Sequence, residues 1–282
     1  MAPKSKYTAD EWLQVGLRKP KGTGRRVGGV STKRAGYPAL FNGTSSATKL
    51  LVEIAAKEPA RRCDLEENEI RLRGSINLGI RRLEAQGLVR RYMARRTHRL
   101  AQLMFNRSHP LWTPIRSLLA AIAESNGLDF PKAPAQLPSF AEIAPRGSTA
   151  TLRIYGHEPD PIYTLFGPER RTIKILAVAT VGVVDQSTLA RLAGHNTTNE
   201  IACAIKPLVA DRIFVSEFVG NLTVFSLPKE PWANELRELA AAICKRDNRL
   251  AGELRALRTM MISGVYRAPM KRRLERYESL GI

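Results

Sequence analysis

The side chains with the most specific binding chemistry lie close together between positions 75 and 82. Helical periodicity places Ile76, Ile80 and Leu83 on one buried stripe. The outward face then carries Ser75, Asn77, Leu78, Arg81 and Arg82. An asparagine amide or an arginine guanidinium can form two hydrogen bonds at once to the edge of an adenine or a guanine. The pattern predicts a helix that reads bases with Ser75 and Asn77, while the two arginines serve bases or, equally well, phosphates near the helix C-terminus.

A run of cations follows this helix in the sequence. Between positions 90 and 99 it includes Arg91, Arg95, Arg96, His98 and Arg99. On a β-hairpin these side chains would lie against a phosphate backbone or in a minor groove. The alternative that stays open is a solvated basic hairpin without a target.

A third basic segment precedes both. Residues 1–36 contain nine Lys or Arg and two acidic residues, and glycines are interleaved around Arg25 and Arg26. Such a composition is too polar to fold alone, so we expect a flexible basic arm. An arm of this kind can lie along a minor groove, and a solubilising tail is the competing interpretation.

Catalytic and metal-binding patterns are weak. The four histidines, His98, His109, His157 and His195, are far apart and fit neither a triad nor a metal-ligand spacing. The three cysteines have no paired spacing, which argues against a disulfide framework and a CxxC metal site. Glu66, Glu67 and Glu69 fit a solvated helix face better than an acid–base pair. We expect a protein that is not an enzyme and needs no cofactor or metal.

The net charge points to a polyanionic partner. With 45 Lys plus Arg against 26 Asp plus Glu, the formal charge is +19, which favours nucleic acid through counterion release. The chain has no apolar run long enough to span a membrane and no signal-peptide core at its N-terminus. We therefore expect a cytoplasmic, nucleoid-associated protein whose partner is double-stranded DNA and not a membrane.

An internal repeat sets the architecture. Leu40-Phe41 recurs 125 residues later as Leu165-Phe166, and the stripe Ile76, Ile80 and Leu83 recurs as Ile201, Ile205 and Leu208. The offset then falls to 120, with Phe105 matching Phe225 and Trp112 matching Trp232. The sequence therefore predicts that one structural unit occurs twice.

The pattern of each unit predicts helices followed by a hairpin and a further helix. In the second unit, Asp185 to Ser187 offer polar N-caps for a short helix, and strand-like runs flank Gly220-Asn221. A last helix is expected from Trp232 to about Met261. Its apolar face suits packing on the matching helix from Trp112 to Ala123, or a homodimer through the C-terminal helices of two chains. The predicted fold class is mainly α with small β-hairpins, α+β.

Particular motifs add a family resemblance. The Leu-Phe-Gly-Pro motif at 165–168, the run at 189–194, and the segment from Gly220 to Trp232 resemble bacterial ArsR-like and MarR-like winged-helix regulators. The first unit is similar through residues 80–89, with Gly87 where those families turn from recognition helix to wing. The resemblance implies two winged helix-turn-helix domains in tandem, with residues 75–82 on the helix that enters the major groove.

These patterns divide the chain into segments. We expect a basic arm at 1–36, a first winged-helix domain at 37–125, a Pro-rich linker at 126–148, a second winged-helix domain with a long C-terminal helix at 149–262, and a basic segment at 263–282. Within the second domain, residues 149–155 and 162–166 alternate like a short hairpin.

The two units differ in charge. Residues 61–107 contain 12 basic and 5 acidic side chains, whereas residues 186–225 contain 3 of each. We therefore expect the first domain to be the main DNA reader. In the second, Asn199 and Lys206 lie on a small and nearly neutral outward face, for which packing on another module is as good an interpretation as contact with DNA.

The function expected from these features is sequence-specific binding of double-stranded DNA, in transcription regulation, at an asymmetric site. The alternative is a replication initiator of a plasmid or mobile element, since some of these also use two winged helices. A nonspecific nucleoid or RNA-binding protein, in which charge dominates, ranks third.

Overall fold

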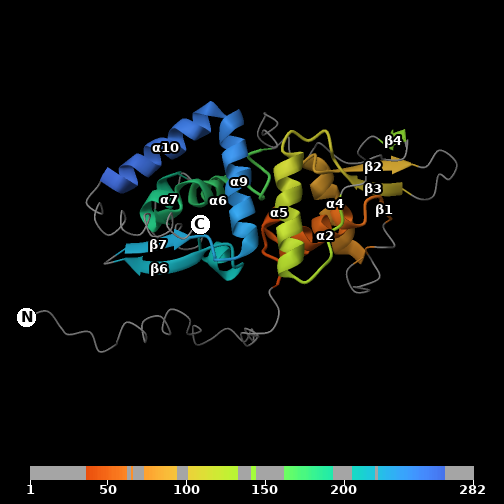
Figure 1. The fold of residues 1–282 in the computed structure, drawn as a ribbon, viewed down its shortest axis with the longest axis horizontal. Coiled ribbons are helices and arrows are strands. Elements are labelled where there is room, and N and C mark those ends of the chain that lie inside the picture. Colours follow the sequence, from red (N-terminus) through yellow and green to blue (C-terminus); the bar gives the residue numbers. More distant parts are fainter. Residues whose placement is uncertain are drawn as a thin grey trace, which may run out of the picture. The chain divides into compact units, whose positions relative to one another are not determined.

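The computed structural model of this chain describes residues 36–61, 65, 73–93, 101–132, 141–143, 162–192, 205–219 and 222–263. The chain divides into two units, Met1–Arg34 and Ala35–Ile282, and every described residue belongs to the second. The described part of that unit is mainly helical and carries small antiparallel sheets (Figure 1). At this level the predicted α+β class is confirmed.

The first half of the unit leads from a short 3-10 turn to a long helix. Its elements are η1 (Phe41–Gly43), α2 (Ser45–Ala56), β1 (Ala60–Arg61), α4 (Arg73–Ala85), β2 (Val89–Met93), β3 (Ala101–Phe105) and α5 (Trp112–Ser125). Helix α2 begins at Thr44, whose hydroxyl accepts a hydrogen bond from the amide of Ala47 at 3.2 Å. That bond satisfies one of the amides that a helix start leaves unpaired.

The described elements of the second half follow a similar order, with α7 (Gln186–Leu192) and α10 (Asn248–Ser263) in addition. The other elements are α6 (Glu169–Val181), β5 (Val183–Asp185), a helical segment at 205–210, β6 (Val215–Val219), β7 (Leu222–Ser226) and α9 (Pro231–Arg246). The predicted cap of the short helix is confirmed. The Asp185 carboxylate accepts hydrogen bonds from the amides of Ser187 at 2.9 Å and Thr188 at 3.0 Å.

The sheets of the two halves are connected alike. Strand β3 lies between β1 and β2, and β7 lies between β5 and β6, with every pair antiparallel. Val219 pairs with Leu222, so the second hairpin turns where Gly220-Asn221 predicted it. Each half therefore has its last hairpin closed against one short strand that follows an earlier helix.

The chain also leaves the helix before each hairpin in the same way. Gly87 has a φ of 68°, and Arg212, its equivalent 125 residues later, has a φ of 59°. The next amides bond back to equivalent carbonyls, Leu88 N to Leu83 O at 3.0 Å and Ile213 N to Leu208 O at 2.9 Å. This is the αL termination that favours glycine, and the second half achieves it with an arginine.

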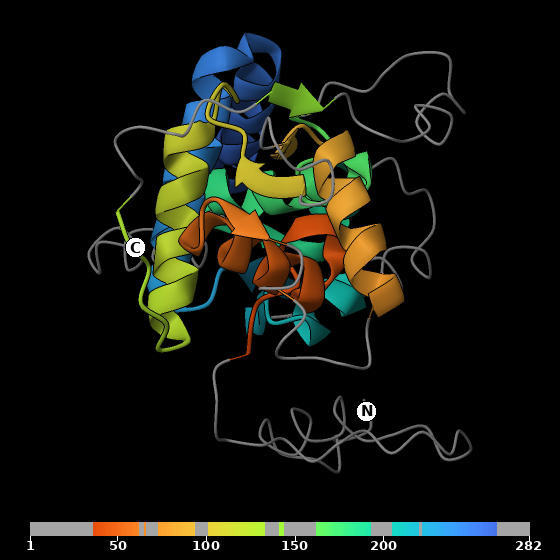
Figure 2. The same ribbon diagram turned by 90° about the vertical axis from the view of Figure 1, so that its right-hand side faces the viewer.

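Equivalent elements of the two halves pack against each other. Helices α5 and α9 lie side by side in both views (Figures 1 and 2). The rings of Phe41 and Phe166, which are repeat equivalents, have centroids 5.8 Å apart. Buried apolar residues of both halves form one contiguous cluster. Contact between like elements is the mark of a two-fold interface, so the two halves pair as the subunits of an isologous dimer do.

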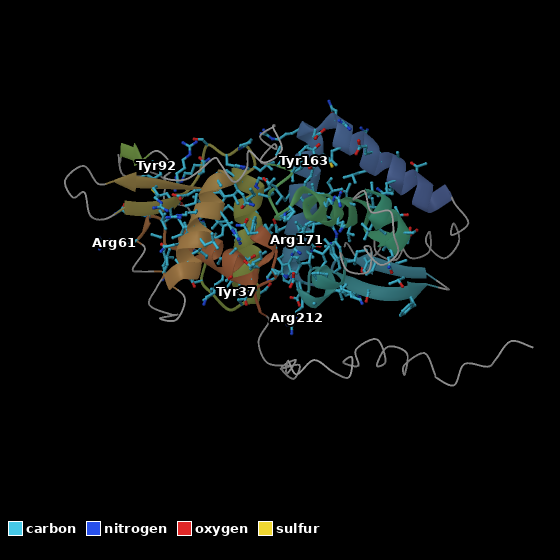
Figure 3. The ribbon with its side chains drawn as sticks, turned by 180° about the vertical axis from the view of Figure 1, so that it is seen from behind. Tyr37, Arg61, Tyr92, Tyr163, Arg171 and Arg212 are labelled. Carbon is cyan, nitrogen blue, oxygen red and sulfur yellow. The ribbon has the colours of Figure 1, made fainter. Side chains whose placement is uncertain are left out.

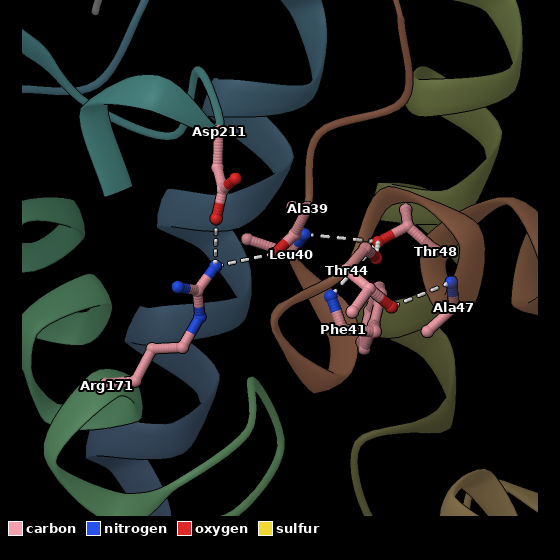
Figure 4. A network of polar contacts seen from close by, with 8 residues as sticks. All are labelled: Ala39, Leu40, Phe41, Thr44, Ala47, Thr48, Arg171 and Asp211. Atoms are coloured by element: carbon pink, nitrogen blue, oxygen red, sulfur yellow. Dashed lines mark hydrogen bonds and ion pairs between the residues drawn. The ribbon is translucent and has the colours of Figure 1, made fainter. Parts of the chain in front are cut away.

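The two Leu-Phe turns lie at the interface between the two halves (the seam) and are held in a similar manner. The hydroxyl of Thr48 accepts hydrogen bonds from the amides of Leu40 and Phe41, both at 3.1 Å (Figure 4). In the second half the Thr172 hydroxyl accepts one from the amide of Phe166 at 3.3 Å. These buried threonines fix the phenylalanines that meet across the seam.

Three expectations about the second half and the linker need correction. The linker contains a strand, β4 (Ala141–Ile143), which pairs with the outer side of β2. Residues 162–166 form turns and no strand, and residues 149–155 lie outside the described residues. The last helix does not continue to Met261, because Asp247 is extended and separates α9 from α10.

Two hydrogen bonds, one local and one distant in sequence, stabilise the break at Asp247. Its carboxylate accepts a hydrogen bond from the Leu250 amide at 3.0 Å, which caps α10, and another from the Tyr163 hydroxyl. Of the two arrangements expected for the apolar face of α9, packing on α5 is the one observed. The homodimer stays a prediction, as do the domain boundaries in the linker.

Candidate nucleic-acid interface

Helix α4 turns one apolar side inward and a polar side outward, as its periodicity predicted. Ile80 and Leu83 are buried, and Ile76 is half-buried. On the outward side, Leu78 is 50% exposed, and Arg81 and Arg82 are exposed. This mixed outer surface offers two guanidinium groups and one apolar side chain.

The other two expected base readers are placed less completely. Asn77 is half-buried on α4. Ser75 lies in α4, but its side chain is outside the described part of the structure. An added Cβ at Gly79 would come within 2.9 Å of the Leu50 Cδ2, so the inner side of α4 packs closely on α2. This close packing fixes the orientation of the outward residues.

Arg91 is held by an ion pair within the protein. Its guanidinium donates to both carboxylate oxygens of Glu84, at 2.5 Å from Nε and 2.9 Å from Nη2. The Glu84 side chain is only 5% exposed, so the pair joins the end of α4 to β2 in a partly desolvated place. Arg91 thus positions the hairpin relative to α4, and its contact with DNA remains an expectation.

Most of the other expected contact residues cannot be placed. Arg95, Arg96, His98 and Arg99 lie outside the described residues, as do Asn199, Arg25 and Arg26. Lys206 is described and is exposed on the helical segment 205–210. The structure therefore brings Asn77, Leu78, Arg81 and Arg82 together on one helix and leaves the remaining members of the set untested.

The second hairpin carries a different surface from the basic run of the first. Phe218 is 66% exposed and Val215 is 40% exposed, both on β6. Glu217, between them, is half-buried. An apolar and acidic strand is a poor surface for a phosphate backbone.

An ion pair that the sequence did not predict holds the end of the first hairpin in place. The Glu58 carboxylate, 1% exposed, accepts hydrogen bonds from the Phe105 amide at 3.1 Å and from the Arg107 guanidinium at 3.2 Å. The same guanidinium lies 5.7 Å from the ring centroid of Trp112. These contacts tie the chain after α2 to the end of β3. No local pattern reveals them, because Glu58 and Arg107 are 49 residues apart.

A second set of polar contacts that the sequence did not predict joins the two halves. Arg171 donates to the carbonyl of Ala39 at 2.6 Å and pairs with Asp211 at 3.3 Å (Figure 4). One turn further along α6, burial and the nearby Arg170 and Arg171 lower the pKa of Lys174 to about 8. A lysine whose charged form is disfavoured by burial therefore lies on α6, and not on the outward face of α4.

Other kinds of site are not evident in the described residues. They contain no group of three or more His, Cys, Asp or Glu side chains placed to hold a metal ion. None of the described helices combines the length and the apolar character needed to cross a bilayer. Comparison with known proteins gives no match to a family model, to a curated protein or to a solved structure. What the outward face of α4 binds must therefore be inferred from its own chemistry.

Proposed function

We propose that this protein is a sequence-specific binder of double-stranded DNA and a transcription regulator, built from two winged helix-turn-helix units. The observation that carries the proposal is the outward face of α4. Its exposed guanidinium groups, Arg81 and Arg82, stand beside Asn77 and an exposed leucine on a helix whose opposite side is buried. A helix presenting such residues suits the major groove, where they can meet guanine, adenine and the thymine methyl group.

The overall charge supports the same proposal. The net charge of +19 provides nonspecific attraction to DNA, and of the two repeats the first is the basic one, with 12 basic and 5 acidic side chains in residues 61–107 against 3 of each in residues 186–225. The first half is therefore the principal reader, with the cations of residues 90–99 and of the N-terminal arm as phosphate contacts. Because the outward faces of the two halves differ, the bound site is expected to be asymmetric although the halves pair about a pseudo-two-fold axis.

Selection of bound duplexes from a random pool tests the proposal at physiological salt. The wild type should enrich one asymmetric motif, and Asn77→Ala should relax it at one or two positions. A lost bidentate contact corresponds to about 1–3 kcal/mol, or roughly 5- to 150-fold in discrimination. The measurement is the binding ratio between the selected duplex and a scrambled one.

A charge-matched control distinguishes sequence-specific contacts from nonspecific electrostatic attraction to DNA. Arg81→Ala with Arg82→Ala removes two positive charges from α4, and Arg249→Ala with Arg255→Ala removes two from exposed positions of α10. The α4 pair should reduce the discrimination ratio, whereas the α10 pair should leave it unchanged. Absence of an enriched motif, with binding that collapses as salt rises, would contradict sequence-specific reading and leave charge-driven coating of nucleic acid.

A further inference from the structure

A cleft of about 390 Å³ opens at one end of the seam between the two halves, a volume within the range of small-molecule sites. Pro38, Val209, Phe214 and Trp232 supply apolar wall, and Asn126 and Arg212 supply polar groups. Residues of both halves line it, since Pro38 and Asn126 come from the first and the rest from the second. Anything bound there would contact both halves at once.

The pseudo-two-fold arrangement of the seam gives this cleft a counterpart. The Gln86 amide donates to the carbonyl of Thr164 at 2.6 Å. At the equivalent positions 125 residues away, Asp211 holds Arg171, which donates to the carbonyl of Ala39. The chain at 163–164 therefore meets the end of α4 as the chain at 38–39 meets the end of the segment 205–210.

The counterpart of Pro38 in this arrangement is Tyr163. The Tyr163 side chain is half-buried, packs against the apolar core, and donates its hydroxyl to Asp247. Burial first and this hydrogen bond second raise the pKa of Tyr163 to about 12. With the offset of 120, Asp247 is the equivalent of Gly127, which directly follows the cleft residue Asn126. Figure 3 places Tyr163 at one end of the seam and Arg212 at the other, with Arg171 between them.

At one end of the seam a half-buried phenol ring donates its hydroxyl to Asp247, and at the equivalent place of the other end Pro38 lines the cleft. We propose that the cleft binds a small phenol, the chemical equivalent of the Tyr163 side chain. Its ring would lie between the apolar walls formed by Phe214 and Trp232, and its hydroxyl would point to Asn126. The Asn126 amide nitrogen already donates to the carbonyl of Ile122 at 2.8 Å, so its carbonyl oxygen is the group suited to accept from the ligand.

The position of the cleft gives binding a structural consequence. Its walls join the end of α5 to Val209, near the end of the helical segment 205–210, and to the chain that follows as far as Ser216. A ligand that binds the folded pair and not the unfolded chain raises the free energy of unfolding by RT ln(1 + L/Kd), where L is the free ligand concentration, so the gain grows with that concentration. A phenol should therefore hold the two halves together, whether or not the protein binds DNA.

Titration of the full chain with p-cresol, which is the tyrosine side chain as a free molecule, tests the proposal by calorimetry and ligand-observed NMR. Saturable one-to-one binding is expected below about 10 mM. Toluene, which lacks the hydroxyl, should bind about 3- to 10-fold more weakly, the loss expected for one hydrogen bond. The melting temperature should rise with p-cresol concentration.

Two variants that place an aromatic ring in the cleft test whether p-cresol binds there. Pro38→Tyr reproduces in the first half the residue of the second, and Ser216→Trp places a ring in the cleft from an exposed wall position. Each should reduce p-cresol affinity at least 10-fold, whereas Glu238→Trp, at an exposed position of α9 outside the cleft, should not. If Pro38→Tyr does not fold, Ser216→Trp decides alone. No saturable binding, or binding that a folded filling variant leaves unchanged, would overturn the proposal.

Discussion

Helix α4 and the helical segment 205–210 end in the same backbone conformation and lead into hairpins of the same connectivity, yet they present different surfaces. On α4 the outward side carries Leu78, Arg81 and Arg82. On the segment 205–210 Lys206, Pro207 and Ala210 are exposed, and on the hairpin that follows the exposed side chains include Val215 and Phe218. Buried positions were kept in both copies of the repeat because each half must cover the same core. The exposed positions had no such constraint, and this is where the binding chemistry differs.

The outer edges of the two sheets also differ between the halves. In the first half the outer side of β2 is covered by β4, with Arg91 opposite Ile143. In the described part of the second half, β6 pairs only with β7. An uncovered edge with exposed apolar side chains favours pairing with protein over contact with phosphate. We therefore expect the proposed nucleic-acid contacts mainly in the first half.

The largest effects are expected at the place where the halves are most alike. Phe41→Ala and Phe166→Ala should each reduce the free energy of unfolding by about 3–5 kcal/mol, because each removes a fully buried ring from the shared core. The rings are in contact, so the two losses should not add in the double variant. Chemical denaturation of the single and double variants measures the coupling. Additive losses, or two separate unfolding transitions, would show that the halves are independent domains.

Local periodicity was sufficient to predict much of this framework. The stripe of Ile80 and Leu83, the Asp185 cap and the turn at 220–221 all depend on neighbouring residues, and all three agree with the structure. Packing of α9 on α5 is one of the two arrangements that the apolar face of the last helix allowed. These features follow from short-range rules that a single sequence expresses.

The expectations that were wrong depended on contacts distant in sequence. The break after α9 is stabilised by Tyr163, 84 residues before Asp247, and β4 is a strand only because β2 offers it an edge. The ion pair of Arg91 with Glu84, seven residues earlier, was also not predicted, and the contact of Arg91 with DNA stays a prediction. Charge and spacing predict where cations are, and they do not predict which of them an internal carboxylate holds.

The second prediction concerns pH and a buried lysine that has a less buried equivalent. Burial lowers the pKa of Lys174 to about 8 from its usual 10.5, so above pH 8 the folded state loses a proton that the unfolded chain still holds. Unfolding then takes up a proton, and the free energy of unfolding should rise as pH increases from about 8 to 10. The expected gain is on the order of 1–2 kcal/mol.

The measurement is the free energy of unfolding at several pH values in wild type and in Lys174→Met. Subtracting the two profiles removes the contributions of groups they share, including Tyr163, whose raised pKa acts in the opposite direction above pH 10. The matched control is Lys49→Met at the repeat equivalent, which is 31% exposed and lies 3.8 Å from Glu53. If Lys174→Met keeps the wild-type slope, burial of this lysine is not the cause.

The smallest expected effect distinguishes the two halves at a single backbone position. Arg212 adopts the αL conformation that Gly87 adopts at the equivalent place, and a residue with a Cβ is strained there by about 1 kcal/mol. Arg212→Gly should therefore raise the free energy of unfolding, by an amount that the greater entropy of glycine in the unfolded chain reduces. Gly87→Ala should lower the free energy of unfolding by about 1 kcal/mol. Nothing within 4 Å would meet a Cβ at Gly87, so the loss there would report backbone strain and no steric clash. Thermal unfolding of the two variants measures both signs. If Arg212→Gly is destabilising, the arginine must make a stabilising contact worth more than the strain, and its place at the wall of the cleft makes p-cresol binding by this variant the next comparison.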